Sequence, residues 1–204
     1  MLRPFLCALL GAFTVCAAPV SLFDDKTFAG WDGDTNRIWR IEEGALVAGD
    51  LKSMVPRNEF VATLRSYTNF VLRAQFKIEG TEGFVNGGIQ VRSQRIPNHN
   101  EMIGYQADIG EGWYGCLYDE SRRNTVLARP EAAAVAKAFK PGEWNDYEIR
   151  CEGPRVRLSI NGVPMVDYVE KDPAIVPSGR IGLQVHGGGK TRIAYRRLTL
   201  EELP

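Results

Sequence analysis

The sequence is short of the features that nucleic-acid binding requires. Its 25 basic residues are matched by 25 acidic residues, so the formal net charge is +0. Nucleic acid is bound by a concentrated basic surface that displaces counterions, and the pair Arg122-Arg123 is too small to form one. We therefore predict no nucleic-acid partner.

Cysteine is also scarce, with four residues in the chain. Cys7 and Cys16 belong to the N-terminal segment described below, which leaves Cys116 and Cys151. Two cysteines do not make a disulfide scaffold, and they can either be buried as small hydrophobic residues or form one bridge. The sequence leaves both arrangements open.

No apolar run reaches the roughly 20 residues that a transmembrane helix needs. The N-terminus instead begins with Met-Leu-Arg, followed by an almost wholly apolar run over residues 5–15 and by small residues up to Ala17. This order is typical of a signal peptide, so we predict that residues 1–17 are removed and that the protein is exported to the periplasm or the extracellular space. Attachment as a lipoprotein through Cys16 is less expected, because the residues before it match a lipidation site poorly.

Helical periodicity is nearly absent. One alanine-rich stretch, residues 130–139, predicts a short helix. The rest consists of short segments in which apolar and polar residues alternate, as over residues 70–78, and Asn161-Gly162 predicts a tight hairpin turn. We therefore predict a single all-β domain over residues 18–204, in which two antiparallel sheets pack as a jelly-roll or lectin-like sandwich.

Three of the predicted strands carry polar side chains at alternate positions, and they lie in Asn86–Ser93, Gly104–Asp108 and Ile181–His186. Alternate residues of a strand share a face, so we expect these side chains to form the polar floor of a ligand site. The alternatives are an exposed cross-strand ion pair for the charged residues and a solvated strand end for the histidine. The floor candidates are Gln90, Arg92, Gln106, Asp108, Gln184 and His186.

Aromatic and charged residues close to these strands suit a sugar ligand. Aromatic faces stack on the apolar faces of sugar rings, although core packing is the alternative explanation for at least one of the rings. The charged segment that follows them is either a rim that contacts hydroxyl groups or a solvated loop. The candidates are Trp113, Tyr114, Tyr118, Glu120, Arg122, Arg123 and Trp144.

A divalent metal is a further candidate ligand. Asp108, Glu120 and His186 could converge on one, although they lack any compact ligand spacing. The sequence indicates no other cofactor.

Six segments follow one another in an order and spacing that are more specific than any single segment. They are Leu22–Trp31, Asn86–Ser93, Gly104–Asp108, Gly142–Asn145, Leu158–Gly162 and Gly179–Gly187. Together they resemble the 3-keto-disaccharide hydrolase domain family. The resemblance implies a jelly roll of the concanavalin A-like lectin/glucanase type that acts on sugars, with hydrolysis of 3-keto-glycosides as the associated activity. The family often has a glutamate where this chain has Gln106, and the acidic group falls instead at Asp108.

The implied reaction needs one base and one electrophile, because the ketone acidifies the hydrogen at C2 of the sugar. Under this hypothesis Asp108 or His186 is the base, and Arg92 stabilises the enolate. The alternative is a non-catalytic carbohydrate-binding module on the same sandwich. The particular glycoside, its anomeric configuration and the oligomeric state are left open.

Overall fold

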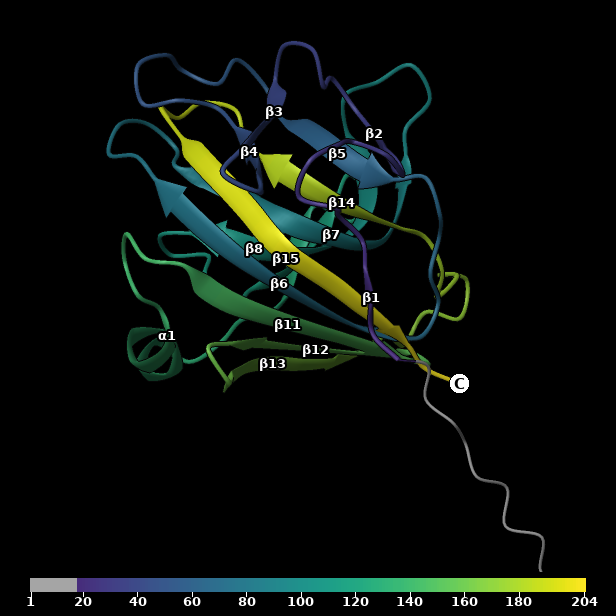
Figure 1. Ribbon diagram of the computed structural model, residues 1–204. Coiled ribbons are helices and arrows are strands. Elements are labelled where there is room, and N and C mark those ends of the chain that lie inside the picture. Colours follow the sequence, from purple (N-terminus) through teal and green to yellow (C-terminus); the bar gives the residue numbers. More distant parts are fainter. Residues whose placement is uncertain (1–17) are drawn as a thin grey trace, which may run out of the picture.

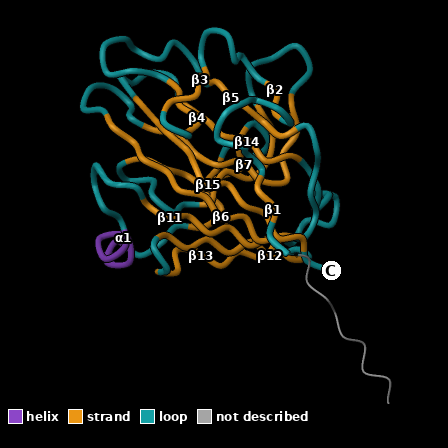
Figure 2. Tube along the Cα trace, viewed as in Figure 1, coloured by secondary structure: helices purple, strands orange, loops and turns teal. Residues whose placement is uncertain are grey.

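The computed structural model describes residues 18–204. The predicted signal peptide, residues 1–17, and the alternative lipoprotein site lie outside the described residues. In the part of the chain that is described, no helix is long and apolar enough to cross a membrane. Strands account for most of the regular structure, as the orange segments of Figure 2 show.

One layer is an antiparallel sheet of eight strands. Its members are β1 (Val20–Ser21), β3 (Trp39–Glu42), β4 (Ala45–Ala48), β6 (Phe70–Glu79), β11 (Asn145–Glu152), β12 (Arg155–Ile160), β13 (Val163–Val169) and β15 (Arg192–Glu202). They lie in the order β13-β12-β11-β6-β15-β4-β3, and β1 pairs with β15 (Figure 1). The long strands β6 and β15 form the middle of this first sheet.

The other layer is an antiparallel sheet of seven strands. Its members are β2 (Trp31–Asp32), β5 (Glu59–Thr63), β7 (Asn86–Arg95), β8 (Met102–Gly110), β9 (Leu117–Glu120), β10 (Thr125–Ala128) and β14 (Arg180–Val185). They lie in the order β10-β9-β8-β7-β14-β5-β2. The three strands predicted to carry the polar floor, β8, β7 and β14, are therefore neighbours in the middle of this second sheet.

The hydrophobic core lies between the two sheets. On β6, Leu72, Ala74 and Phe76 are buried, while the intervening Arg73 is exposed. On the second sheet, Ile89 belongs to the same core cluster. Because burial of apolar surface drives folding, this alternation fixes which face of each strand turns inward. The predicted antiparallel sandwich is confirmed.

Two local predictions are also confirmed. The helix α1 (Ala132–Ala138) falls within the alanine-rich stretch and lies beside β13. Asn161 and Gly162 connect β12 to β13 with φ values of 48° and 76°, the left-handed conformation that a two-residue hairpin turn requires. Cys116 and Cys151 are both buried and free.

Candidate functional site

A row of buried polar side chains crosses the outer face of the second sheet. Gln90 on β7 lies opposite Gln106 on β8, and Asp108 lies opposite Gly88, which pairs on its other side with Gln184 of β14. The four polar residues are at most 3% exposed. The structure thus brings four of the floor candidates together. They lie on one face because paired residues of neighbouring strands have their side chains on the same side of the sheet.

Hydrogen bonds fix the orientation of these side chains. Ser93 Oγ donates to Gln90 Oε1, and Gln90 Nε2 donates to Gln106 Oε1 at 3.1 Å. Gln106 Nε2 then donates to Asp108 Oδ1 at 2.8 Å and to Gln184 Oε1 at 3.1 Å. At the end of this amide chain, Asp108 Oδ2 is buried without a hydrogen-bond partner among the described residues, and the Gln184 side chain lies against Glu120.

Two glycines make room for the amide chain. A Cβ atom on Gly88 would lie 2.7 Å from Gln106 Cγ, and one on Gly182 would lie 2.6 Å from Met102 Sδ. Both distances are shorter than a carbon atom tolerates without displacing its neighbour. Larger residues at these positions would push the floor outward.

A pocket of about 150 Å³ opens over one end of the floor. Its aromatic walls stand edge to face, with ring centroids 6.0 Å apart for Trp113 and Tyr118 and 6.3 Å apart for Phe84 and Trp113. Apolar rings above a polar floor suit a sugar, whose ring has apolar C–H faces and polar hydroxyl groups. The lining residues are Phe84, Asn86, Gln106, Asp108, Trp113, Tyr118, Glu120 and His186.

Burial alters the acidity of the two carboxyl groups in the pocket. It raises the pKa of Asp108 to about 8, the nearby charge of Glu120 adds to the rise, and the hydrogen bond from Gln106 opposes it. Burial also raises the pKa of Glu120 to about 7, and the charge of Glu101 adds to that rise. At neutral pH, Asp108 is therefore mostly protonated, and Glu120 is present in both its protonated and its ionised form.

His186 lies just past the end of β14, and its ring packs edge to face on Phe84 with centroids 4.7 Å apart. Its Nδ1 atom is 2.6 Å from the carbonyl oxygen of Gly187, which can only accept a hydrogen bond, so Nδ1 carries the proton. Burial lowers the pKa of His186 below 6.5. The ring is consequently neutral at neutral pH, and Nε2 has a free lone pair.

The structure does not place Arg92, the predicted enolate stabiliser, on the floor or in the pocket lining. The pairing of β7 with β8 shifts register between Val91 and Gln94, and Arg92 has a φ of 50°. This bulge interrupts the alternation of the strand and turns the side chain away from Asp108. The guanidinium group instead donates to the carbonyl oxygens of Thr68 at 2.8 Å and Gly153 at 2.7 Å.

Arg122 and Arg123 do not form a rim around the pocket either. Arg122 pairs with the buried carboxylate of Asp119 at 2.7 Å, and Arg123 pairs with Glu170 at 2.7 Å. Asp119 faces the opposite side of β9 from the pocket residue Glu120, because adjacent strand residues alternate. The two arginines therefore pair with carboxylates away from the pocket lining.

Two of the predicted aromatic residues, Tyr114 and Trp144, lie away from the pocket. Tyr114 lies next to Trp113 in sequence but stacks on Phe139, with ring centroids 3.7 Å apart. Trp144 packs on the outer face of the first sheet, where Arg196 lies 4.0 Å above its ring. Neither residue lines the pocket, because neighbouring residues of a turn or strand point in different directions.

Sequence reasoning missed three residues of the site. Phe84 and Asn86 line the pocket, and Asn86 shares the alternation of Gln90 on β7, which could have revealed it. Glu101 acts at a distance through its effect on Glu120, and its Oε2 atom is buried without a partner. It lies in the loop before β8, where no periodic signal exists.

A compact metal site is absent from the described residues. Within residues 18–204, no three His, Cys, Asp or Glu side chains are grouped closely enough to hold a metal ion. Asp108, Glu120 and His186 share a pocket without forming a ligand set.

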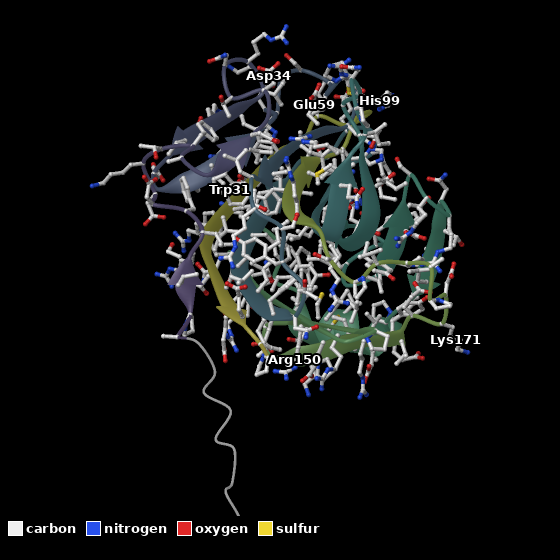
Figure 3. All side chains as sticks on the ribbon, turned by 90° about the vertical axis from the view of Figure 1, so that its right-hand side faces the viewer. Trp31, Asp34, Glu59, His99, Arg150 and Lys171 are labelled. Carbon is white, nitrogen blue, oxygen red and sulfur yellow. The ribbon has the colours of Figure 1, made fainter. Side chains whose placement is uncertain are left out.

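A larger hollow of about 730 Å³ lies at the end of the molecule where Figure 3 labels Asp34, Glu59 and His99. Its charged groups are paired with one another, as Arg57 is with Glu59 at 2.8 Å. His99 Nδ1 accepts the backbone N–H of Glu101 at 3.2 Å. Among the described residues that line this hollow, none has a buried polar side-chain atom without a partner. The smaller pocket is therefore the better candidate site.

Residues 18–201 match the family model of the 3-keto-alpha-glucoside-1,2-lyase-like domain. The chain belongs to this family. The match confirms the resemblance stated from the sequence segments. None of the curated proteins matches the chain in sequence.

Solved structures share the fold at low sequence identity. A protein described as a glycosyl hydrolase from Parabacteroides distasonis has a TM-score of 0.69 and 20% identity, with 91% of this chain and 94% of that chain covered. The carbohydrate-binding module CBM66 from Bacillus subtilis has a TM-score of 0.65 and 15% identity, with 85% of this chain and 96% of that chain covered. These similarities show a jelly-roll sandwich common to hydrolases and binding modules.

Proposed function

We propose that the chain cleaves 3-keto-glycosides by elimination across C2 and C1, followed by hydration. The family match supports a substrate of this class. The observation that carries the proposal is His186, whose neutral ring lines an aromatic pocket with an unprotonated Nε2. A neutral imidazole in such a pocket is suited to remove a proton from carbon next to a ketone.

The proposed reaction begins with loss of the proton at C2. His186 Nε2 accepts the C2 proton, and the electrons of the C–H bond form the enolate between C2 and the C3 oxygen. The enolate collapses to the ketone as a C1=C2 double bond forms, the C1–O bond breaks, and Glu120 protonates the leaving oxygen. Water then adds its hydroxyl group to C1 and gives its proton to Glu120, while His186 Nε2, whose proton has exchanged with solvent, returns a proton to C2. The net result is hydrolysis to a 3-keto sugar.

The test is incubation of a 3-keto-glucoside in deuterated water. We expect release of a 3-keto sugar that carries deuterium at C2, because the original hydrogen is lost in the first step. Product without the label would reject the elimination route. Sugar affinity without any release would indicate the alternative, a carbohydrate-binding module.

The two histidines of the chain provide a matched pair of variants. We expect His186→Ala to lower kcat by about 10²- to 10⁴-fold, the usual contribution of a general base. His99→Ala should leave kcat unchanged, because His99 lies in the larger hollow. Equal turnover in both variants would remove His186 from the role of base.

Export stays a proposal, and it rests on the N-terminal sequence. Intact-mass measurement of secreted material should give a chain that begins near Ala18. A chain that retains residues 1–17 would contradict it.

A further inference from the structure

The pocket needs a group that stabilises negative charge on the substrate, and among the described residues no Lys or Arg lines it. Arg92 donates to backbone carbonyl groups elsewhere. The guanidinium group of Arg129 lies 5.4 Å from the centroid of Trp113, and its Nη1 donates to the carbonyl of Gly112. An enolate formed in this pocket must therefore be stabilised by neutral donors.

Asp108 offers one such donor. Its Oδ1 atom accepts a hydrogen bond from Gln106 Nε2, whose direction is set because Gln106 Oε1 already accepts from Gln90. A proton on the Asp108 carboxyl group therefore belongs on Oδ2, the atom that is buried without a partner. Burial raises the pKa of Asp108 to about 8, so this proton is present at neutral pH.

Gln184 holds Gln106 in place from the neighbouring strand. Its Oε1 atom accepts from Gln106 Nε2 at 3.1 Å, which directs its own amide nitrogen away from Gln106. The residue is fully buried and does not line the pocket, and a hydrogen bond from its side chain lowers the pKa of Glu120. Gln184 therefore positions Gln106 and Glu120, and Asp108 Oδ2 is the donor that faces a ligand.

We infer that Asp108, as a neutral carboxylic acid held in place by Gln106 and Gln184, donates a hydrogen bond to the C3 oxygen of the substrate and stabilises its enolate, while His186 removes the C2 proton. Buried, preorganised donors at the atom where charge develops are an effective form of transition-state stabilisation. A carboxylic acid kept neutral by burial can act in this way. The inference rests on the proposed function, and it assigns Asp108 a role that excludes action as the base.

The two roles of Asp108 predict opposite behaviour for one substitution. In Asp108→Asn, the side-chain N–H₂ group replaces the O–H donor in a residue of nearly the same shape, but the residue can no longer act as a base. We expect Asp108→Asn to retain kcat within about tenfold of the wild type. Asp108→Leu, which fills the space without a donor, should lose about 10²- to 10³-fold in kcat, the usual effect of removing one such donor.

Gln184→Met provides a parallel test, because it removes the amide at similar length. It should lower kcat more than it raises KM, since Gln184 does not line the pocket and acts by positioning Gln106 and Asp108. Circular dichroism of each variant checks that the fold is retained. Asp108→Asn remains informative if Asp108→Leu does not fold.

Turnover of the wild type tests the proposed function, and turnover of Asp108→Asn tests the donor role of Asp108. A wild type that releases no product from any 3-keto-glycoside overturns both. An active wild type together with an Asp108→Asn variant as slow as His186→Ala overturns the inference alone, because Asp108 would then be the base. An NMR carboxyl signal that shows Asp108 ionised at pH 7 would also overturn it, independently of turnover.

Discussion

Replacing Asp108 with asparagine should make the protein more stable at neutral pH. The pKa of Asp108 is raised from 3.8 to about 8 by burial in the folded chain. A raised pKa gives stability that is complete below the unfolded-state value and is lost as pH increases through the folded-state value. Between these two values, the unfolded chain releases a proton that the folded chain retains, so the free energy of unfolding of the wild type falls as pH rises.

The size of the effect follows from the separation of the two pKa values. Each pH unit above 3.8 costs the wild type about 1.4 kcal/mol, and the asparagine variant has no such cost. At pH 7 the difference is about 4 kcal/mol in favour of Asp108→Asn, and about 3 kcal/mol of it should disappear when the pH is lowered to 5. The groups whose charges face Asp108, Glu120 and Arg129, are common to both proteins.

Urea denaturation at several pH values measures this difference directly. The control is Asp25→Asn, which removes an exposed carboxylate and should show no comparable dependence on pH. A difference between wild type and Asp108→Asn that is the same at pH 5 and pH 7 would refute the reasoning. Asp108 would then ionise in the folded protein as an ordinary aspartate does, and it could not act as a neutral donor.

Three further predictions concern other parts of the molecule. With increasing pH, kcat/KM should first rise at a pH below 6.5, where His186 loses its proton, because burial lowers the pKa of His186. It should then fall above about pH 7, as Glu120 and next Asp108 lose the protons that they donate. Arg92→Met should lower the free energy of unfolding by about 3 kcal/mol in urea denaturation without changing KM, because it removes the charged hydrogen bonds to the carbonyl groups of Thr68 and Gly153. Gly88→Ala should lower kcat in steady-state assays, since the added carbon would displace Gln106; an unchanged rate would show that the floor adjusts freely.

The sequence predicted the sandwich well because its strands are regular. Alternation at period two placed Gln90, Gln106, Asp108 and Gln184 on one face, and the structure has them there. The same rule failed at Arg92, where a bulge adds one residue to β7 and changes the direction of the side chain. Nothing in the residues around Arg92 marks such a bulge.

Other parts of the site depend on the three-dimensional arrangement of the chain. Trp144 begins an alternating segment, but only the assignment of β11 to the first sheet shows that its ring lies away from the pocket. Glu101 lies just before β8, and its charge raises the pKa of Glu120 on the neighbouring strand β9. Identical sequence patterns are compatible with either sheet, so long-range pairing decides these positions.

Alanine scanning of this site would not detect its two floor glycines. Alanine scanning detects residues by removing side-chain atoms, and Gly88 and Gly182 have none to remove. Their contribution is the volume that they leave to Gln106 and Met102. A survey of this protein that only truncates side chains would therefore miss the two positions that set the depth of the floor, whereas one that adds a methyl group at each glycine would find them.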